Sequence, residues 1–216
     1  MNLKISGTSK MLLLSVGFLM SLLLVRFIYS NNTLVYRFYG WNTFLAAIPY
    51  FISTQLIKIS KLNVAAIVLI GLWLLFFPNA PYLITDLFHY EERADVPFWY
   101  DLLIVVSGAW NGLILGMTSL MNVEKFLARH VKPIWVTISV FFSLLLCSYG
   151  VFIGRFLRFN SWNIVTDPRG LVYTSAHHVL SPQNYPKLWV FTILFTVFLT
   201  IVYFTLKKLP RIPETK

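Results

Sequence analysis

The sequence is poor in charged residues and in cysteine. Only 12% of its 216 residues are charged, against about a quarter in ordinary globular chains. Hydrophobic residues make up 57%, so a water-soluble domain of this length could not cover its apolar surface with so few charges. A single cysteine, Cys147, excludes a disulfide framework and a cysteine-based zinc site. The hydrophobic content also excludes intrinsic disorder, and we expect the lipid bilayer to surround most of the chain.

The formal charge of +10 does not indicate binding to nucleic acid. The 18 Lys and Arg residues occur singly or in small groups between apolar runs, without the basic stripe that a nucleic-acid-binding domain carries. Basic residues between hydrophobic segments are typical of membrane proteins, in which they set the orientation. We therefore expect the bilayer, and no nucleic acid, as the partner.

Six apolar runs approach the ~20 residues that cross a hydrocarbon core. These predicted spans cover residues 11–29, 41–57, 64–82, 97–121, 133–157 and 188–206. The first is interpreted as an uncleaved anchor because no small-residue cleavage site follows it, and Arg26 is expected to snorkel outward. The fold prediction is a single all-α domain over residues 1–216, a bundle of about six transmembrane helices whose third helix is broken by Pro78 and Pro81.

The loop charges predict that both termini lie in the cytoplasm. With the N-terminus inside, eleven of the 18 basic residues fall on the inner side and seven on the outer side, which agrees with the positive-inside rule. The inner residues are Lys4, Lys10, Lys58, Lys61, Lys125, Arg129, Lys132, Lys207, Lys208, Arg211 and Lys216. This predicts a multi-pass protein of the cell membrane.

The longest segment outside the spans is 159–187. It contains a predicted turn at Asp167–Gly170, with proline at its second position. The following residues, Leu171–Leu180, are expected to form a short helix on the membrane surface.

Polar residues gather where the third span ends. Asn79 can cap a new helix start after the break, and the next turns place Asp86 and His89 on one face, three residues apart. One interpretation is an acid/base or metal-ligand pair. The alternative is a capped helix end whose polar face meets headgroups and water.

A metal site would need further ligands from the same predicted side of the membrane. Candidates are Glu91, Glu92, Asp95, Asp101, His177 and His178, and nothing in the spacing selects among them. The metal candidates are therefore Asp86, His89, His177 and His178, and the catalytic candidates are Asp86, His89 and Asp101. The sequence assigns no cofactor.

The fourth span carries Gly108, Gly112 and Gly116 on one face, which favours close helix packing. We expect this row to pack within the chain, against Gly150 and Gly154 of the fifth span, with a homo-oligomer interface as the alternative. Asp101 precedes the glycines on nearly the same face and should point into the bundle. Asn111, in mid-span, is expected to form a hydrogen bond between helices.

Two arginines end the fifth span. Arg155 and Arg158 can snorkel, bind phosphate or pair with the acids, and pairing is favoured because buried acids need partners. Arg155, Arg158, Asn79 and Asn111 are the binding candidates. The overall prediction is one outward-opening polar site formed by Asp86, His89, Asp101, Arg155 and Arg158.

Four stretches of the chain resemble a bacterial family of predicted membrane proteins, domain of unknown function 1361. They are Trp73–Leu87, Trp99–Leu103, Ala109–Gly112 and Gly154–Trp162. The first contains the most specific run, Phe77-Pro78-Asn79-Ala80-Pro81-Tyr82. The resemblance implies a multi-pass bacterial membrane protein and brings no activity, cofactor or catalytic residue.

Three classes of function stay open at this point. A binding or structural membrane protein needs only the bundle and its polar cluster. An enzyme would use Asp86, His89 and Asp101 on a lipid or an extracytoplasmic substrate. A small-solute transporter would need a polar path through the bundle, for which Asn42, Asn79 and Asn111 are the candidates.

Overall fold

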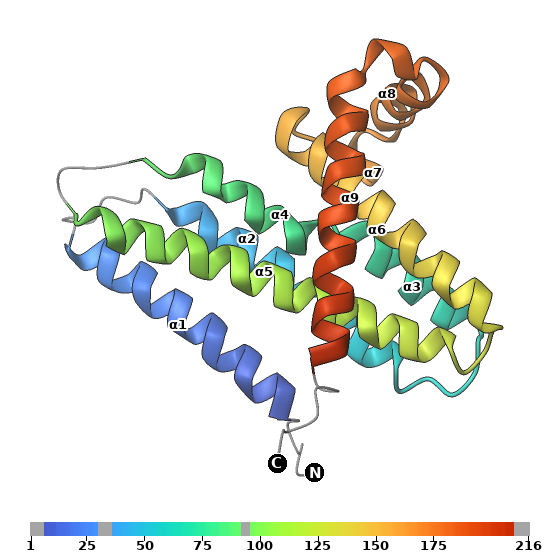
Figure 1. The fold of residues 1–216 in the computed structure, drawn as a ribbon, viewed down its shortest axis with the longest axis horizontal. Coiled ribbons are helices and arrows are strands. Elements are labelled where there is room, and N and C mark those ends of the chain that lie inside the picture. Colours follow the sequence, from blue (N-terminus) through green and yellow to red (C-terminus); the bar gives the residue numbers. More distant parts are fainter. Residues whose placement is uncertain (1–6, 30–35, 92–95, 210–216) are drawn as a thin grey trace.

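The protein is described by a computed structural model that covers residues 7–29, 36–91 and 96–209 (Figure 1). These residues form helices and no strand. The elements are α1 (Gly7–Tyr29), α2 (Arg37–Leu56), α3 (Val64–Phe76), α4 (Asn79–Thr85), the 3₁₀ turn η1 (Asp86–His89), α5 (Phe98–Leu127), α6 (Pro133–Phe156), α7 (Asn163–Thr166), α8 (Pro168–Leu180), the 3₁₀ turn η2 (Pro182–Asn184) and α9 (Pro186–Lys208). The predicted all-α bundle is confirmed.

Five helical segments of the described chain are long and apolar enough to cross a membrane. They are Ser9–Tyr29, Val64–His89, Phe98–Leu127, Pro133–Phe156 and Pro186–Lys208. Helix α2, with 20 residues, is not among the five, yet it leads from the end of α1 to the start of α3 on the opposite side of the bundle (Figure 1). A sixth crossing by α2 stays a prediction.

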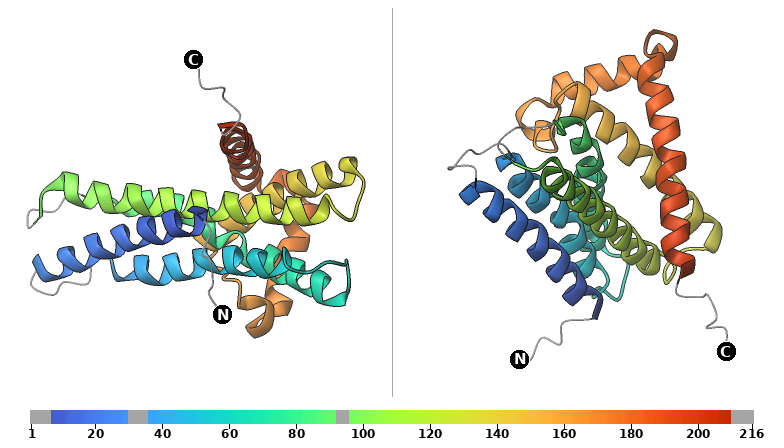
Figure 2. Two further views of the ribbon diagram at one scale, coloured as in Figure 1. Left: turned by 90° about the horizontal axis from the view of Figure 1, so that it is seen from below. Right: turned by 60° about the vertical axis from the view of Figure 1, so that its left-hand side comes forward.

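The long helices alternate in direction, so the bundle has two distinct ends (Figures 1 and 2). We call one the α8 end; it holds the last turn of α1, η1, the first turn of α5, and α7 to the start of α9. The other, the short-loop end, holds the connections 57–63 and 128–132. The first turn of α1 and the last turn of α9 both lie toward the short-loop end (Figure 2).

The third span is broken at Phe77–Pro78, where a proline removes a backbone donor. The amide of Ala80 donates to the carbonyl of Phe77 at 3.2 Å, so the carbonyl of Phe76 loses its helical partner. The side chain of Asn79 replaces it, because Nδ2 donates to Phe76 O at 2.9 Å. Asn79 therefore closes the end of α3, and the expectation that it caps the start of α4 is wrong: Pro78 holds that position without a side-chain bond.

The glycines of α5 pack within the chain, but not against the fifth span. A Cβ added at Gly112 would lie 2.3 Å from the backbone oxygen of Ala80 in α4, and one at Gly108 would lie 2.3 Å from the Tyr39 ring of α2. Gly116 also faces Ala80, at 3.2 Å. This row is covered by α2 and α4 and offers no surface to a second copy of the chain.

The glycines of α6 contact the same broken segment from the other side. A Cβ at Gly150 would lie 2.6 Å from Pro78, and one at Gly154 would lie 3.5 Å from the Tyr82 ring. The expected contact between the two glycine rows is thus wrong, because α4 lies between them. Small residues on both neighbours let a proline-bearing helix pack deep in the bundle.

Helix α8 starts at the predicted turn. The carboxylate of Asp167 accepts from the amide of Gly170 at 3.0 Å, and Pro168 occupies the first helical position, as both residue types favour. The turn is therefore the first turn of α8.

Candidate functional site

Arg155, near the end of α6, joins four residues of the segment after the helix break. Its Nε donates to Thr85 Oγ1 at 2.8 Å, one terminal nitrogen lies 2.7 Å from His89 Nε2, and the other donates to Asp86 Oδ1. The guanidinium carbon lies 4.4 Å from the centre of the Tyr82 ring. We call Thr85, Asp86, His89 and Arg155 the Arg155 cluster; it ties α4 and η1 to α6.

Asp86 is fully buried, and both of its carboxylate oxygens have a donor. Arg155 binds Oδ1, and Asn42 Nδ2 of α2 donates to Oδ2 at 3.1 Å. A buried carboxylate is tolerated when it has a counter-charge and hydrogen bonds. Here these come from two helices that flank the broken span.

The contact with Arg155 sets the hydrogen-bonding role of His89 Nε2. A guanidinium has only donors, so Nε2 accepts from Arg155. His89 is exposed, so the Arg155 cluster reaches the protein surface through its imidazole, while the charges of Asp86 and Arg155 satisfy each other inside.

Asp101 belongs to a separate ion pair at the start of α5. Its carboxylate binds Arg26 of α1, with Nε–Oδ1 at 2.7 Å and Nη2–Oδ2 at 3.4 Å. Arg26 is 3% exposed and Asp101 is 1% exposed. The expectations that Arg26 snorkels outward and that Asp101 pairs with Arg155 or Arg158 are wrong. An inward arginine on the first span neutralises Asp101, so the acid does not need the fifth span.

Arg158 lies outside the Arg155 cluster. Its backbone has a φ of 60°, in the left-handed region that ends α6, and its side chain is exposed. Its guanidinium makes no ion pair with any residue that the structure describes. Of the five residues expected to converge, the structure brings together Asp86, His89 and Arg155.

The histidines expected as metal ligands serve other contacts. His178 Nδ1 lies 2.9 Å from Tyr149 Oη, and His177 Nδ1 lies 3.1 Å from the carbonyl of Tyr173. Burial lowers the pKa of His178, and the neighbouring His177 lowers it further.

No three His, Cys, Asp or Glu residues of the described chain are grouped as metal ligands. Arg155 covers Asp86 and His89, so a cation at this pair would meet a positive charge. Glu92 and Asp95, two further candidate ligands, lie outside the described residues.

Asn111 joins two helices, as expected of a polar residue in mid-span. Its Nδ2 donates to the carbonyl of Ser107 at 2.8 Å and to that of Ser15 in α1 at 3.3 Å. This position, between α1 and α5, is away from Asn42 and Asn79, which line a cavity on the other face of the broken span.

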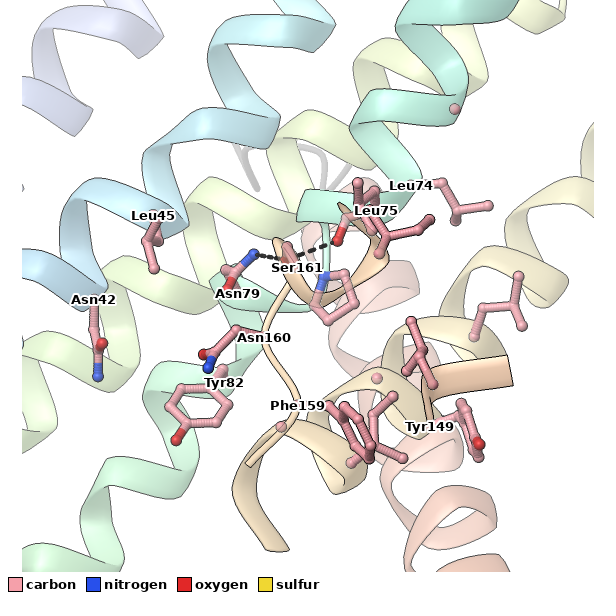
Figure 3. Close-up of a pocket in the computed structure, with 18 residues that line it drawn as sticks. Asn42, Leu45, Leu74, Leu75, Asn79, Tyr82, Tyr149, Phe159, Asn160 and Ser161 are labelled. Atoms are coloured by element: carbon pink, nitrogen blue, oxygen red, sulfur yellow. Dashed lines mark hydrogen bonds between the residues drawn. The ribbon is translucent and has the colours of Figure 1, made fainter. Parts of the chain in front are cut away.

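That cavity has a volume of about 380 Å³. Its walls come from α2, α3, α4, α6 and the segment 159–171, and it borders the helix break (Figure 3). Its polar lining includes Asn42, Asn79, Tyr82, Asn160 and Ser161, and most of the remainder is aliphatic or aromatic.

The loop after α6 is tied to the broken helix at the cavity wall. Ser161 Oγ accepts from Asn79 Nδ2 at 2.9 Å and donates to the carbonyl of Leu75 at 3.1 Å (Figure 3). The carbonyl of Leu75, just before the break, is therefore satisfied by a residue 86 positions away in the sequence.

Sequence reasoning did not identify the cavity, nor Arg26, Asn160 and Ser161 as parts of the polar structure. Arg26 carried a usable signal, because an ionisable residue inside a span usually faces the bundle. Asn160 and Ser161 lie in the Gly154–Trp162 stretch, but helical spacing cannot show that this loop folds back onto α3 and α4.

Comparison with known proteins gives a family without an assigned activity. No curated protein and no solved structure matches the chain significantly. The family described as "Protein of unknown function (DUF1361)" matches residues 41–202, which include the broken span, the Arg155 cluster and the cavity. The chain belongs to this family, DUF1361.

Proposed function

We propose that this multi-pass membrane protein binds an amphiphilic molecule from the bilayer in the cavity beside the broken third span. The observation that carries the proposal is the cavity itself, about 380 Å³ with hydrogen-bonding side chains and apolar walls. Pockets for small ligands usually span ~300–1,000 Å³ and combine these two kinds of lining.

The position of the cavity supports a ligand that comes from the membrane. Gly71 and Leu74 of α3 and Leu146 of α6 form part of the wall, and both helices belong to segments that can cross a bilayer. Gly71 is exposed on the outer surface of α3. An apolar chain could therefore enter from the hydrocarbon, while its head group meets the polar residues.

The Arg155 cluster has a structural role in this proposal. The charges of Asp86 and Arg155 satisfy each other, and Thr85, His89 and Asn42 supply further hydrogen bonds. The cluster holds α4 and Tyr82 in place, and Tyr82 forms part of the cavity wall.

The arrangement favours binding over the two alternatives. An enzyme using Asp86, His89 and Asp101 together is disfavoured because Asp101 sits in a separate pair with Arg26. A transport path through Asn42, Asn79 and Asn111 is disfavoured because Asn111 lies between α1 and α5.

The orientation proposed for the cell membrane places the α8 end outside and both termini in the cytoplasm, as the loop charges predict. Reporter fusions at Ser175 should then read extracytoplasmic, and fusions at Ser60 should read cytoplasmic. A cytoplasmic signal at Ser175 and an extracytoplasmic signal at Ser60 would contradict the orientation. They would not affect the proposal that the cavity binds a ligand.

The binding proposal is tested by the lipids that accompany the purified protein. Gly71 lines the cavity, and a Cβ at this position meets nothing within 4 Å, so Gly71→Leu should fill part of the cavity without a backbone clash. Gly17 in α1 is also exposed and also open, and it lies in a separate groove on α1 and outside this cavity, which makes Gly17→Leu a control for adding a leucine to an exposed helix face. Mass spectrometry of extracts should show an amphiphile near one per protein in the wild type and in Gly17→Leu, and much less in Gly71→Leu. Equal lipid content in all three would overturn the proposal.

A further inference from the structure

We infer that the cavity selects a lipid whose head group is uncharged and rich in hydroxyl groups, such as an acylglycerol or a glycosylated lipid. The inference rests on the proposed function and adds the chemical class of the ligand. It follows from the charge of the cavity lining and from the hydrogen-bonding groups that the protein leaves unused there.

The lining of the cavity is uncharged. Its 18 residues include no Asp, Glu, Lys, Arg or His. Arg155 contacts the Tyr82 ring but is not part of the lining, and it is already bound to Thr85, Asp86 and His89. A phosphate in the cavity would find no cation in the lining, and burying an unpaired charge is costly.

Two asparagines in the lining donate to other residues and retain their acceptor oxygens. Asn42 Nδ2 donates one of its two hydrogens to Asp86, and its Oδ1 is an acceptor. Asn79 Nδ2 donates to Phe76 O and to Ser161 Oγ, which uses both of its hydrogens. Neither amide oxygen receives a hydrogen bond from any described residue.

Asn160 and Tyr82 are two further polar residues of the lining. In Figure 3 the Asn160 amide lies between Asn79 and Tyr82, and the Tyr82 hydroxyl makes no hydrogen bond within the described chain. Together, Asn42, Asn79, Asn160 and Tyr82 present more acceptors than donors. Hydroxyl groups match this set because each one can donate to an amide oxygen, whereas an ester or ketone offers acceptors alone.

The rest of the lining suits a hydrocarbon chain. Leu74 and Leu75 lie at the opposite side of the cavity from Tyr82 in Figure 3, and Leu146 and Ile153 belong to the same lining. A chain along these residues would keep the head group beside the amides. An apolar pocket with few polar groups at one end fixes the orientation of its ligand in this way.

The first test compares three probes by native mass spectrometry: monooleoylglycerol, monoglucosyl-dioleoylglycerol and dioleoyl phosphatidic acid. We expect one or both neutral lipids to bind the wild type and Gly17→Leu at least tenfold more tightly than they bind Gly71→Leu. The glycerol and glucosyl probes distinguish the two sources of hydroxyl groups. Phosphatidic acid should show no difference between the variants.

The second test removes hydrogen-bonding groups at the cavity. Tyr82→Phe keeps the ring under Arg155 and removes the hydroxyl, while Asn160→Leu replaces the amide with a side chain of similar size. Each should weaken binding of the neutral lipid about two- to tenfold, as expected for one hydrogen bond, with thermal stability close to that of the wild type.

The outcomes separate this inference from the proposed function. Gly71-sensitive binding of phosphatidic acid in preference to both neutral probes would overturn the ligand class and support the binding site. Unchanged neutral-lipid affinity in both Tyr82→Phe and Asn160→Leu would also overturn the class. If Gly71→Leu leaves the affinity of all three probes unchanged, the binding site is overturned as well.

Discussion

Replacing Arg155 by methionine tests whether the Arg155 cluster holds the broken third span in the bundle. The side chain of Arg155 is 10% exposed and that of Asp86 is 1% exposed, so the variant leaves a buried carboxylate without its counter-charge. Breaking one side of a buried ion pair typically costs ~3–5 kcal/mol. The hydrogen bonds to Thr85 and His89 are lost in the same substitution, which places the expected loss toward the upper part of that range.

The measurement is the free energy of unfolding in mixed detergent–SDS micelles. Arg158→Met is the matched control, because Arg158 lies three residues further on, is exposed and has no described ion-pair partner. We expect this control to change the free energy of unfolding by no more than ~0.5 kcal/mol.

A double-mutant cycle then isolates the pair. Asp86→Asn in the Arg155→Met background removes the uncompensated charge and should recover part of the lost stability, with a coupling of ~0.5–3 kcal/mol between the two sites. Equal stability losses for Arg155→Met and Arg158→Met, or strict additivity with Asp86→Asn, would refute the assignment of the cluster as a structural anchor.

Other predictions follow from the packing, the second ion pair and the outer helix. Gly112→Ala should destabilise the protein by more than ~1 kcal/mol, because its Cβ would lie 2.3 Å from a backbone oxygen. Gly71→Ala should be neutral or stabilising by up to ~1 kcal/mol. The free energies of unfolding of the two variants in SDS measure this difference. Arg26→Met should cost ~3–5 kcal/mol in the same assay, since it leaves Asp101 buried without that counter-charge, and a loss below 1 kcal/mol would contradict the pairing. The pKa of His178 is lowered, so the folded state favours its neutral form. The packing of α8 against α6 and α9 should therefore be complete above the ordinary histidine pKa of ~6.5 and weaken as the pH falls below it. Lower protection factors for amide exchange in α8 at pH 5 than at pH 7.5, a difference absent in His178→Gln, would show this.

The sequence allowed the broken third span and the core of the Arg155 cluster to be predicted. Two prolines in four residues must interrupt a helix, and the spacing of Asp86 and His89 places both side chains on one helical face. The need of a buried acid for a cation then points to the two arginines at the end of the fifth span, Arg155 and Arg158, and the structure shows that Arg155 is the partner of Asp86.

The partners of Asp101 and of the glycine rows could not be predicted in the same way. Helical periodicity shows which face of a helix is small or polar, but it does not show which helix lies opposite. Two cations, Arg26 and Arg155, have suitable depth for Asp101, and the choice depends on the placement of α1 beside α5. The glycine rows were likewise assigned to each other because the sequence does not show that α4 lies between them.

The cavity depends on contacts that are still more distant in sequence. Asn160 and Ser161 reach it because the loop after α6 folds back over the helix break, where Ser161 binds the carbonyl of Leu75, 86 residues away. Neither the residue types nor their spacing in the sequence predicts that this loop folds back over the break.

A crystal structure of protein purified from its native membrane would show directly whether the cavity is a ligand site. We expect continuous density for one molecule in the cavity, with its polar end within hydrogen-bonding distance of Asn160 and Tyr82 and its chain along Leu74 and Leu146. A well-resolved cavity that contains only water, or that is filled by the protein's own side chains, would contradict the binding proposal.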